Sequence, residues 1–146
     1  MAKKTSQRLQ TVLKLARLRQ QLAAEQLGAM IQNADAQQQQ AEQLKHYQLD
    51  YGAHLKALGA SGASAGQLVN YQRFMDNLEQ AVVTQQQRVV LARDQREQAR
   101  NRWQQQYARE KNMEALVERK QQQELRVADN RLQREQDDRR PVDPPF

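Results

Sequence analysis

Apolar residues in the first part of the chain recur at alternating gaps of four and three. The pattern covers fifteen positions, of which twelve are apolar. A repeat of 3.5 residues keeps one narrow stripe of a helix turned toward a partner helix, as in a coiled coil. The positions of this first seam are Leu9, Leu13, Ala16, Gln20, Ala23, Leu27, Met30, Ala34, Gln37, Ala41, Leu44, Gln48, Tyr51, Leu55 and Leu58. A helix of about 75 Å, at 1.5 Å per residue, cannot bury this seam against itself, so it needs a partner.

A second run with the same spacing follows. Nine of its eleven positions are apolar. They are Leu68, Tyr71, Met75, Leu78, Val82, Gln85, Val89, Ala92, Arg96, Ala99 and Trp103. Beyond Trp103 the pattern weakens and keeps no single register. Neither Gly nor Pro occurs between there and Pro141. We therefore expect the helix to continue.

The segment 59–66 separates the two runs. It holds three glycines in eight residues. Glycines lower helix propensity and permit positive φ. Ser64 and Gln67 have the spacing of a capping box, which predicts the start of the second helix. Thr5 or Ser6 is the expected N-cap of the first helix. A loop this short makes the neighbouring helices antiparallel.

The sequence therefore predicts an all-α fold, a long antiparallel two-helix coiled-coil hairpin. We expect a single domain over residues 1–140, with helix one at about 6–58, a turn at 59–66 and helix two at about 67–139. With the turn centred near Gly62, residues beyond about 120 lack a partner on helix one, so the last turns should overhang. Residues 141–146 contain all three prolines of the chain. They are expected to form a disordered tail.

Composition and charge agree with this architecture. Aromatic residues make up 5% of the chain and its mean hydropathy is −1.03. This is too polar for a globular core but sufficient for a seam. Residues 1–20 carry six Lys or Arg and no acid, whereas residues 21–85 carry three bases and six acids. Folded as a hairpin, the chain would have a basic open end and an acidic closed end, which suggests a different partner at each end.

The sequence predicts neither an enzyme nor a cofactor or metal site. His46 and His54 lie eight residues apart with no cysteine and no converging carboxylates. We therefore interpret them as solvated helix residues. No phosphate-binding loop or nucleophile–base pattern occurs.

Signals for a membrane or a secretory route are also missing from the sequence. No apolar run reaches the length of roughly 18 residues that a membrane-spanning helix needs. We find no signal segment either, so the expected location is the cytoplasm.

The isoelectric point of 9.9 raises the possibility of nucleic-acid binding. The bases of helix two are interleaved with acids, which is typical of a solvated helix face rather than of a basic region. The six N-terminal bases could also hold an acidic membrane surface. We expect the apolar face of that helix to be committed to the seam, so the sequence does not favour this.

Four aromatic residues cluster near the turn. Tyr51 and Tyr71 fall on the seams and are expected in the core, while Tyr47 and Phe74 fall beside them and are candidate interface anchors. The alternative is that they simply widen the core near the turn.

Two stretches around the turn resemble the FliJ family of the bacterial flagellar type III export apparatus. One runs Gln-Leu-Lys-His-Tyr-Gln-Leu-Asp-Tyr over residues 43–51 and the other Asn-Tyr-Gln-Arg-Phe-Met-Asp-Asn-Leu-Glu-Gln-Ala over residues 70–81. The resemblance implies a fold similar to the central stalk of rotary ATPases. It implies a non-enzymatic protein that binds the hexameric flagellar export ATPase, promotes ATPase assembly and activity, contacts the cytoplasmic domain of the export-gate membrane protein and handles export chaperones.

The resemblance also implies sites and a location. The export-gate face, by matching positions, consists of Gln40, Leu44, Tyr47, Tyr51, Phe74, Leu78, Ala81 and Gln85. Gln85 stands where the family pattern has a histidine. The basic end would enter the ATPase ring, and the candidate ring contacts are Arg8, Lys14, Arg17 and Arg19. The implied location is cytoplasmic, peripheral to the inner membrane at the flagellar basal body, with no nucleic acid and no small-molecule substrate.

Two other interpretations stay open at the level of sequence. One is a basic coiled-coil scaffold or nucleic-acid-binding protein, whose polyanion binding would fall steeply with salt. The other is the equivalent stalk protein of an injectisome, which shares the architecture.

Overall fold

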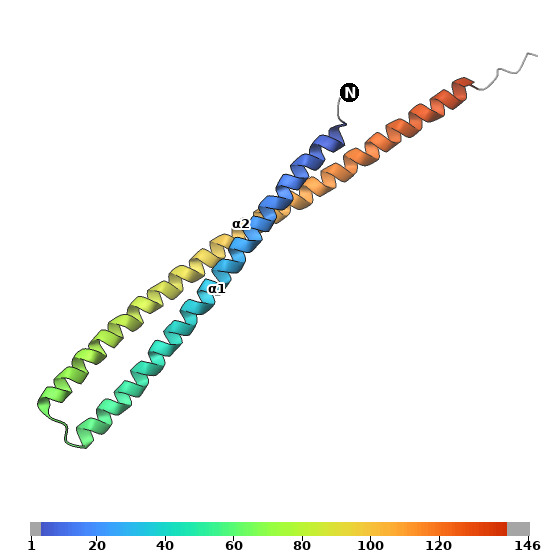
Figure 1. Ribbon diagram of the computed structural model, residues 1–146. Helices are drawn as coiled ribbons and strands as arrows, with labels where there is room; N and C mark the ends of the chain where they lie inside the picture. Colours follow the sequence, from blue (N-terminus) through green and yellow to red (C-terminus); the bar gives the residue numbers. More distant parts are fainter. Residues whose placement is uncertain (1–3, 140–146) are drawn as a thin grey trace, which may run out of the picture. The chain divides into compact units, whose positions relative to one another are not determined.

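The computed structural model describes residues 4–139 as two α-helices packed against each other. The first helix, α1, spans Thr5–Ala60, and the second, α2, spans Ala65–Arg139 (Figure 1). No strand occurs within these residues. The predicted all-α two-helix hairpin is thus confirmed. The tail expected at 141–146 lies outside the described residues.

The described residues form two compact units. The central unit comprises residues 23–103 and contains the turn. The terminal unit comprises residues 4–22, which are Lys4 and the start of α1, and residues 104–139 of α2. The expected single domain over residues 1–140 stays a prediction.

Ordinary local chemistry closes the turn. The Ala63 N–H donates to the Leu58 carbonyl at 3.2 Å. This is the bond of a Schellman motif, which requires a residue with positive φ. Gly62 supplies it, with a φ of 83°.

The predicted capping box at the start of α2 is confirmed. The Gln67 N–H donates to Ser64 Oγ at 3.3 Å, and the Ser64 N–H donates to Gln67 Oε1 at 3.2 Å. Each side chain thus satisfies a backbone N–H that the first turn of a helix leaves without a partner.

The start of α1 differs from the prediction. The Lys4 carbonyl accepts the first helical bonds, from the N–H groups of Gln7 and Arg8. Lys4 is therefore the residue that precedes the helix, and Ser6 lies inside its first turn. The expected N-cap at Thr5 or Ser6 was wrong, because the carboxylate of Glu124 from α2 supplies the capping interaction instead. Any acceptor that reaches the free N–H groups of a first turn can serve in this way.

The burial pattern follows the first seam closely. Every predicted position from Leu9 to Leu58 is buried or half-buried except Tyr51. In the central unit the most buried apolar side chains are small: Ala34, Ala41, Val89, Ala92 and Ala99. Because the side chains at the contact set the distance between helix axes, alanines at these positions let the backbones approach closely.

The second seam does not lose its register after Trp103. Of its predicted positions up to there, only Leu68 is exposed. Buried or half-buried residues then continue at the same spacing through Gln106, Glu110, Met113, Val117, Lys120 and Glu124. Most of these side chains are polar or charged. The spacing of apolar residues alone therefore does not reveal this part of the seam.

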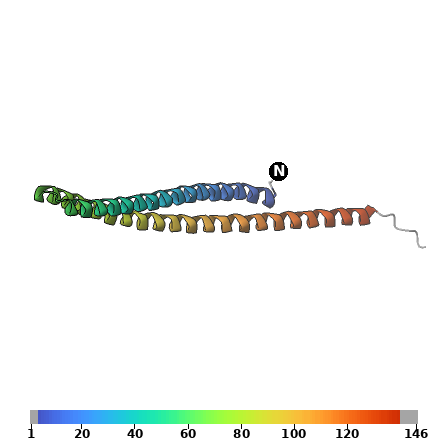
Figure 2. The same ribbon diagram turned by 90° about the horizontal axis from the view of Figure 1, so that it is seen from below.

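The sequence predicted that α2 has no partner on α1 beyond about residue 120, and the pairing in fact continues to Glu124. Glu124 contacts Ser6, so α2 still has a partner on α1 at that position. Beyond Glu124 all described residues of α2 are exposed, and Figure 2 shows its last turns extending past the start of α1.

Candidate functional site

The eight positions predicted to bind the export gate differ in their burial. Five of them are exposed, at Gln40, Tyr47, Tyr51, Phe74 and Ala81. Leu44 and Leu78 are half-buried, and Gln85 is buried. The exposed five are thus available to a partner, whereas Gln85 acts within the hairpin.

On this surface the ring of Tyr51 from α1 contacts the ring of Phe74 from α2. Their ring centroids lie 4.6 Å apart with the rings tilted by 57°. Such a tilted arrangement is favourable for aromatic pairs. Tyr51 was expected in the core, and this was wrong: it is 37% exposed. The neighbouring Gly52 is half-buried instead, and a Cβ placed there would lie 4.0 Å from Met75 Cε. We call Tyr47, Tyr51 and Phe74 the aromatic face.

Gln85 forms a polar layer inside the central unit. Its side chain is 4% exposed, and its Nε2 donates to the Gln37 carbonyl at 2.9 Å and to Gln37 Oε1 at 2.8 Å. Gln37 Nε2 in turn donates to Asn33 Oδ1 at 3.3 Å. A polar contact in a coiled-coil seam specifies which positions of the two helices face each other.

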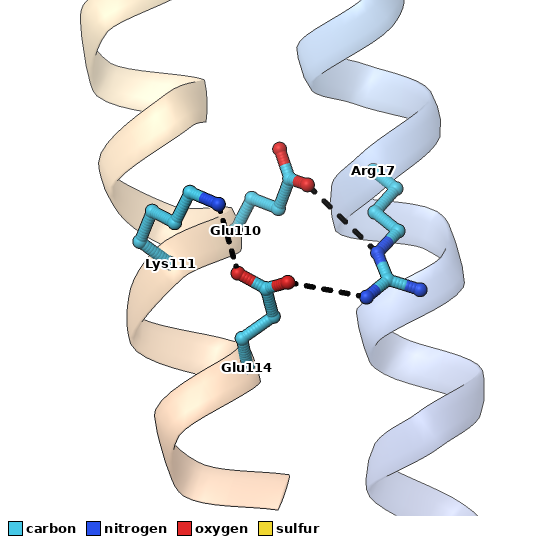
Figure 3. Close-up of polar contacts among 4 residues, drawn as sticks. All are labelled: Arg17, Glu110, Lys111 and Glu114. Carbon is cyan, nitrogen blue, oxygen red and sulfur yellow. Dashed lines mark hydrogen bonds and ion pairs between the residues drawn. The ribbon is translucent and has the colours of Figure 1, made fainter.

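The four candidate ATPase contacts differ in whether they form ion pairs. Arg8, Lys14 and Arg19 are exposed and take part in no ion pair within residues 4–139. Arg17 instead bridges the helices of the terminal unit, with its Nη2 3.2 Å from Glu114 Oε1 and its Nε 3.8 Å from Glu110 Oε1 (Figure 3).

The carboxylate of Glu114 links Arg17 to Lys111. Glu114 Oε2 lies 3.1 Å from Lys111 Nζ (Figure 3). The hydrogen bonds from Lys111 and then from Arg17 lower the pKa of Glu114, and the same carboxylate raises the pKa of Lys111. Each partner favours the charged form of the other. All of these side chains reach solvent, so the cluster contributes little stability and orients Arg17 more than it holds the helices.

Glu124 binds the first turn of α1 through both carboxylate oxygens. The Ser6 hydroxyl donates to Oε2 at 2.6 Å and the Ser6 backbone N–H donates to Oε1 at 3.1 Å. These two bonds lower the pKa of Glu124. An anion here also complements the positive end of the helix dipole.

Two of the grooves between the helices of the terminal unit are lined by candidate ATPase contacts. One, of about 320 Å³, has an apolar lining that includes Val12, Leu15, Met113 and Leu116, together with Arg19 and Arg109. None of its lining residues is acidic. We call it the Arg19 groove. The other, of about 540 Å³, is lined by Lys14 and Arg17 but also by Glu114 and Glu118.

Both histidines lie on the surface of the central unit. His46 and His54 are exposed, and His54 packs on Tyr71 with ring centroids 6.0 Å apart. Within residues 4–139 no group of three His, Asp or Glu side chains could hold a metal ion. In the same range, neither helix has a stretch apolar and long enough to span a bilayer.

Sequence reasoning missed the contacts of α2 in the terminal unit, at Glu110, Glu114 and Glu124. The spacing of the second seam in the sequence could have identified two of them. Glu110 and Glu124 continue the four–three alternation that ends at Trp103, once polar residues are allowed at seam positions. Glu114 lies beside the seam, and only the position of Arg17 on α1 identifies it.

The chain is an all-α helical hairpin, and most of its candidate contact residues lie on the outer faces of the two helices. A family model described as flagellar FliJ protein matches residues 5–140. The chain therefore belongs to the FliJ family, as the resemblance predicted, and is a flagellar export-related protein. No curated protein and no solved structure matched the chain.

Proposed function

We propose that the chain is a non-enzymatic coupling protein that bridges the hexameric export ATPase and the cytoplasmic domain of the export-gate membrane protein. In this role it promotes assembly and activity of the ATPase and receives export chaperones. It would act on the cytoplasmic side of the inner membrane at the flagellar basal body. Membership of the FliJ family supports the flagellar setting.

The aromatic face is the observation that carries the gate-binding part. Tyr47 and Phe74 are exposed large rings, and Phe74 is braced by Tyr51 from the other helix. Rigid aromatic side chains lose little entropy on binding, and they are enriched among residues that dominate interface energies. Exposed apolar patches on a helix surface are otherwise costly to keep in water.

The three exposed bases Arg8, Lys14 and Arg19 support the ATPase-binding part. They lie in a segment, residues 4–22, that has five bases and no acidic residue. Such a segment attracts an acidic surface and speeds encounter with it. Arg17 contributes less directly in this scheme, because Glu110 and Glu114 already engage it.

The double variant Tyr47→Ala with Phe74→Ala tests gate binding separately from ATPase binding. We expect the affinity for the isolated cytoplasmic gate domain to fall by about tenfold or more, since each removed ring is of hot-spot type. Stimulation of the export ATPase, followed as hydrolysis rate against concentration of this chain together with oligomer size, should stay unchanged. Val83→Ala combined with Val90→Ala is the matched control, because both valines are exposed on α2.

Helicity by circular dichroism must be equal in all variants for this comparison. Equal loss of gate binding, ATPase stimulation and helicity in the aromatic variant would mean that the rings only support the hairpin. A parent chain that neither binds nor stimulates the ATPase at low salt would remove the coupling mechanism.

A further inference from the structure

A second line of apolar residues runs along α1 in the terminal unit. Val12, Leu15, Leu18 and Leu22 are spaced by three, three and four. Residues at this spacing lie on one side of a helix. Each is between 45% and 56% exposed. The seam of the same segment uses other residues, such as the buried Leu13. We call this second line the outer leucine line.

The outer leucine line corrects the sequence-based argument against a membrane surface. That argument required the apolar face of the N-terminal helix to be committed to the seam. The segment has two apolar lines, and pairing with α2 covers only the seam.

Bases flank the outer leucine line on both sides. Arg19 lines the Arg19 groove and Lys14 lines the opposite groove. Arg8 precedes Val12 by one helical turn, so it lies on the same side of α1, nearer the start of the helix. All three are exposed, and across the Arg19 groove α2 adds Arg109 rather than an acid. On the other side, Arg17 pairs with Glu110 and Glu114. Glu118 is then the one acid of the groove lined by Lys14 that no ion pair within residues 4–139 engages.

We propose that this face of α1 binds directly to the surface of an anionic phospholipid bilayer. An interfacial helix buries its aliphatic line at the boundary of headgroups and acyl chains while its Lys and Arg side chains extend to the headgroup phosphates. Clusters of bases beside such a line attract anionic lipids. The four aliphatic side chains would supply the buried area, and Arg8, Lys14 and Arg19 the attraction.

The shape of the face favours a bilayer over an acidic protein helix. A helix seated in the Arg19 groove would cover Val12 and Leu15, but Leu18 and Leu22 are not part of the groove lining. A plane tangent to α1 covers all four. Nucleic acid is disfavoured because its phosphates would leave the leucines in water, and the face has no aromatic side chain for base stacking.

The proposal is independent of the proposed coupling function, although both use Arg8, Lys14 and Arg19. One molecule cannot engage a bilayer and an ATPase ring through the same side chains at once. The test therefore uses the full chain and lipid vesicles, with neither the ATPase nor the gate domain present. Failure here would leave the coupling function untouched, and failure of ATPase stimulation would leave this result untouched.

The experiment is flotation of the chain with vesicles of phosphatidylcholine containing phosphatidylglycerol, and with vesicles of phosphatidylcholine alone. We expect binding to the anionic vesicles only, weakening as salt rises. Leu18→Gln combined with Leu22→Gln should lower the vesicle partition coefficient by about tenfold, because the aliphatic contact is lost. Leu49→Gln combined with Leu91→Gln, two leucines exposed in the central unit, should bind as the parent does.

Three outcomes would overturn the proposal. The first is no binding to anionic vesicles, as expected if the face serves an acidic protein. The second is equal binding by the parent and the Leu18/Leu22 variant, which would indicate adsorption by charge alone. The third is an equal loss in the Leu49/Leu91 variant. Should the Leu18/Leu22 variant lose helicity, Leu15→Gln with the same readout replaces it, and unchanged binding by that variant likewise overturns the proposal.

Discussion

The central and terminal units are built from the same two helices and the same spacing of seam positions, but their seams contain different chemistry. In the central unit the buried positions are alanines and Val89, with one polar layer whose donors are satisfied. The terminal unit buries Leu13 and Val117, and its polar contacts between the helices are charged: Glu124 binds Ser6, and Arg17 pairs with Glu110 and Glu114.

The two units also differ in one buried hydrogen-bond acceptor. Gln106 Oε1, in the terminal unit, is covered and accepts no hydrogen bond from the described residues. The central unit should respond to changes of volume and buried polarity. The charged contacts between the helices of the terminal unit should respond to pH and salt as well.

Val89→Asp should have the largest effect. The side chain is 1% exposed, so the substitution places a carboxylate in the seam. Burying a polar group without a partner should lower the free energy of unfolding by about 2–7 kcal/mol. Chemical denaturation followed by circular dichroism measures this.

The matched control for this prediction is Val90→Asp. Val90 is 64% exposed, so its new carboxylate stays in water. A surface substitution of this kind should change stability by only about 0.5 kcal/mol. Similar losses in both variants would contradict the assignment of the seam.

Gln85→Ala tests the polar layer and should have an intermediate effect. Alanine already occupies seam positions 34, 41, 92 and 99, so the new side chain fits and the change mainly removes the bonds to Gln37. We expect a loss of about 1 kcal/mol in the same denaturation experiment. Gln87→Ala, at an exposed neighbouring position, is the control. A stabilised Gln85 variant would show that the layer serves pairing specificity at the expense of stability.

The smallest effect concerns Glu124 and pH. Its pKa in the folded chain is lowered from the ordinary value of 4.5, first by the Ser6 hydroxyl and then by the Ser6 N–H. A lowered pKa gives the fold a stabilising contribution above the ordinary value, and this contribution is lost as the pH falls through the folded value. The amide signal of Ser6 in a ¹H–¹⁵N spectrum should therefore titrate below pH 4.5.

Glu124→Gln should abolish that titration, and Glu118→Gln should not, because Glu118 is exposed and forms no ion pair in the described part of the chain. A midpoint at or above the ordinary value would show that Ser6 does not hold the carboxylate in solution. The central unit offers no comparable signal, since its polar layer has no titratable group.

Both helices and the turn could be predicted because their signals are local. The capping box joins Ser64 to Gln67 three residues away, and the first seam repeats every three or four residues, so each is visible in a short window. The errors came where the signal was not local. Tyr51 was assigned to the core from its spacing alone, but its packing depends on Phe74 and on the half-buried Gly52.

The sequence by itself determined that this protein is two long helices with a closed turn, because helix propensity, seam spacing and turn chemistry all act between near neighbours. Only the tertiary structure decided which polar residues face each other, such as Ser6 with Glu124 and Gln37 with Gln85. It also decided that the outer leucine line stays uncovered. These outcomes depend on how α2 aligns with α1, and that alignment is set by contacts between residues up to 118 positions apart.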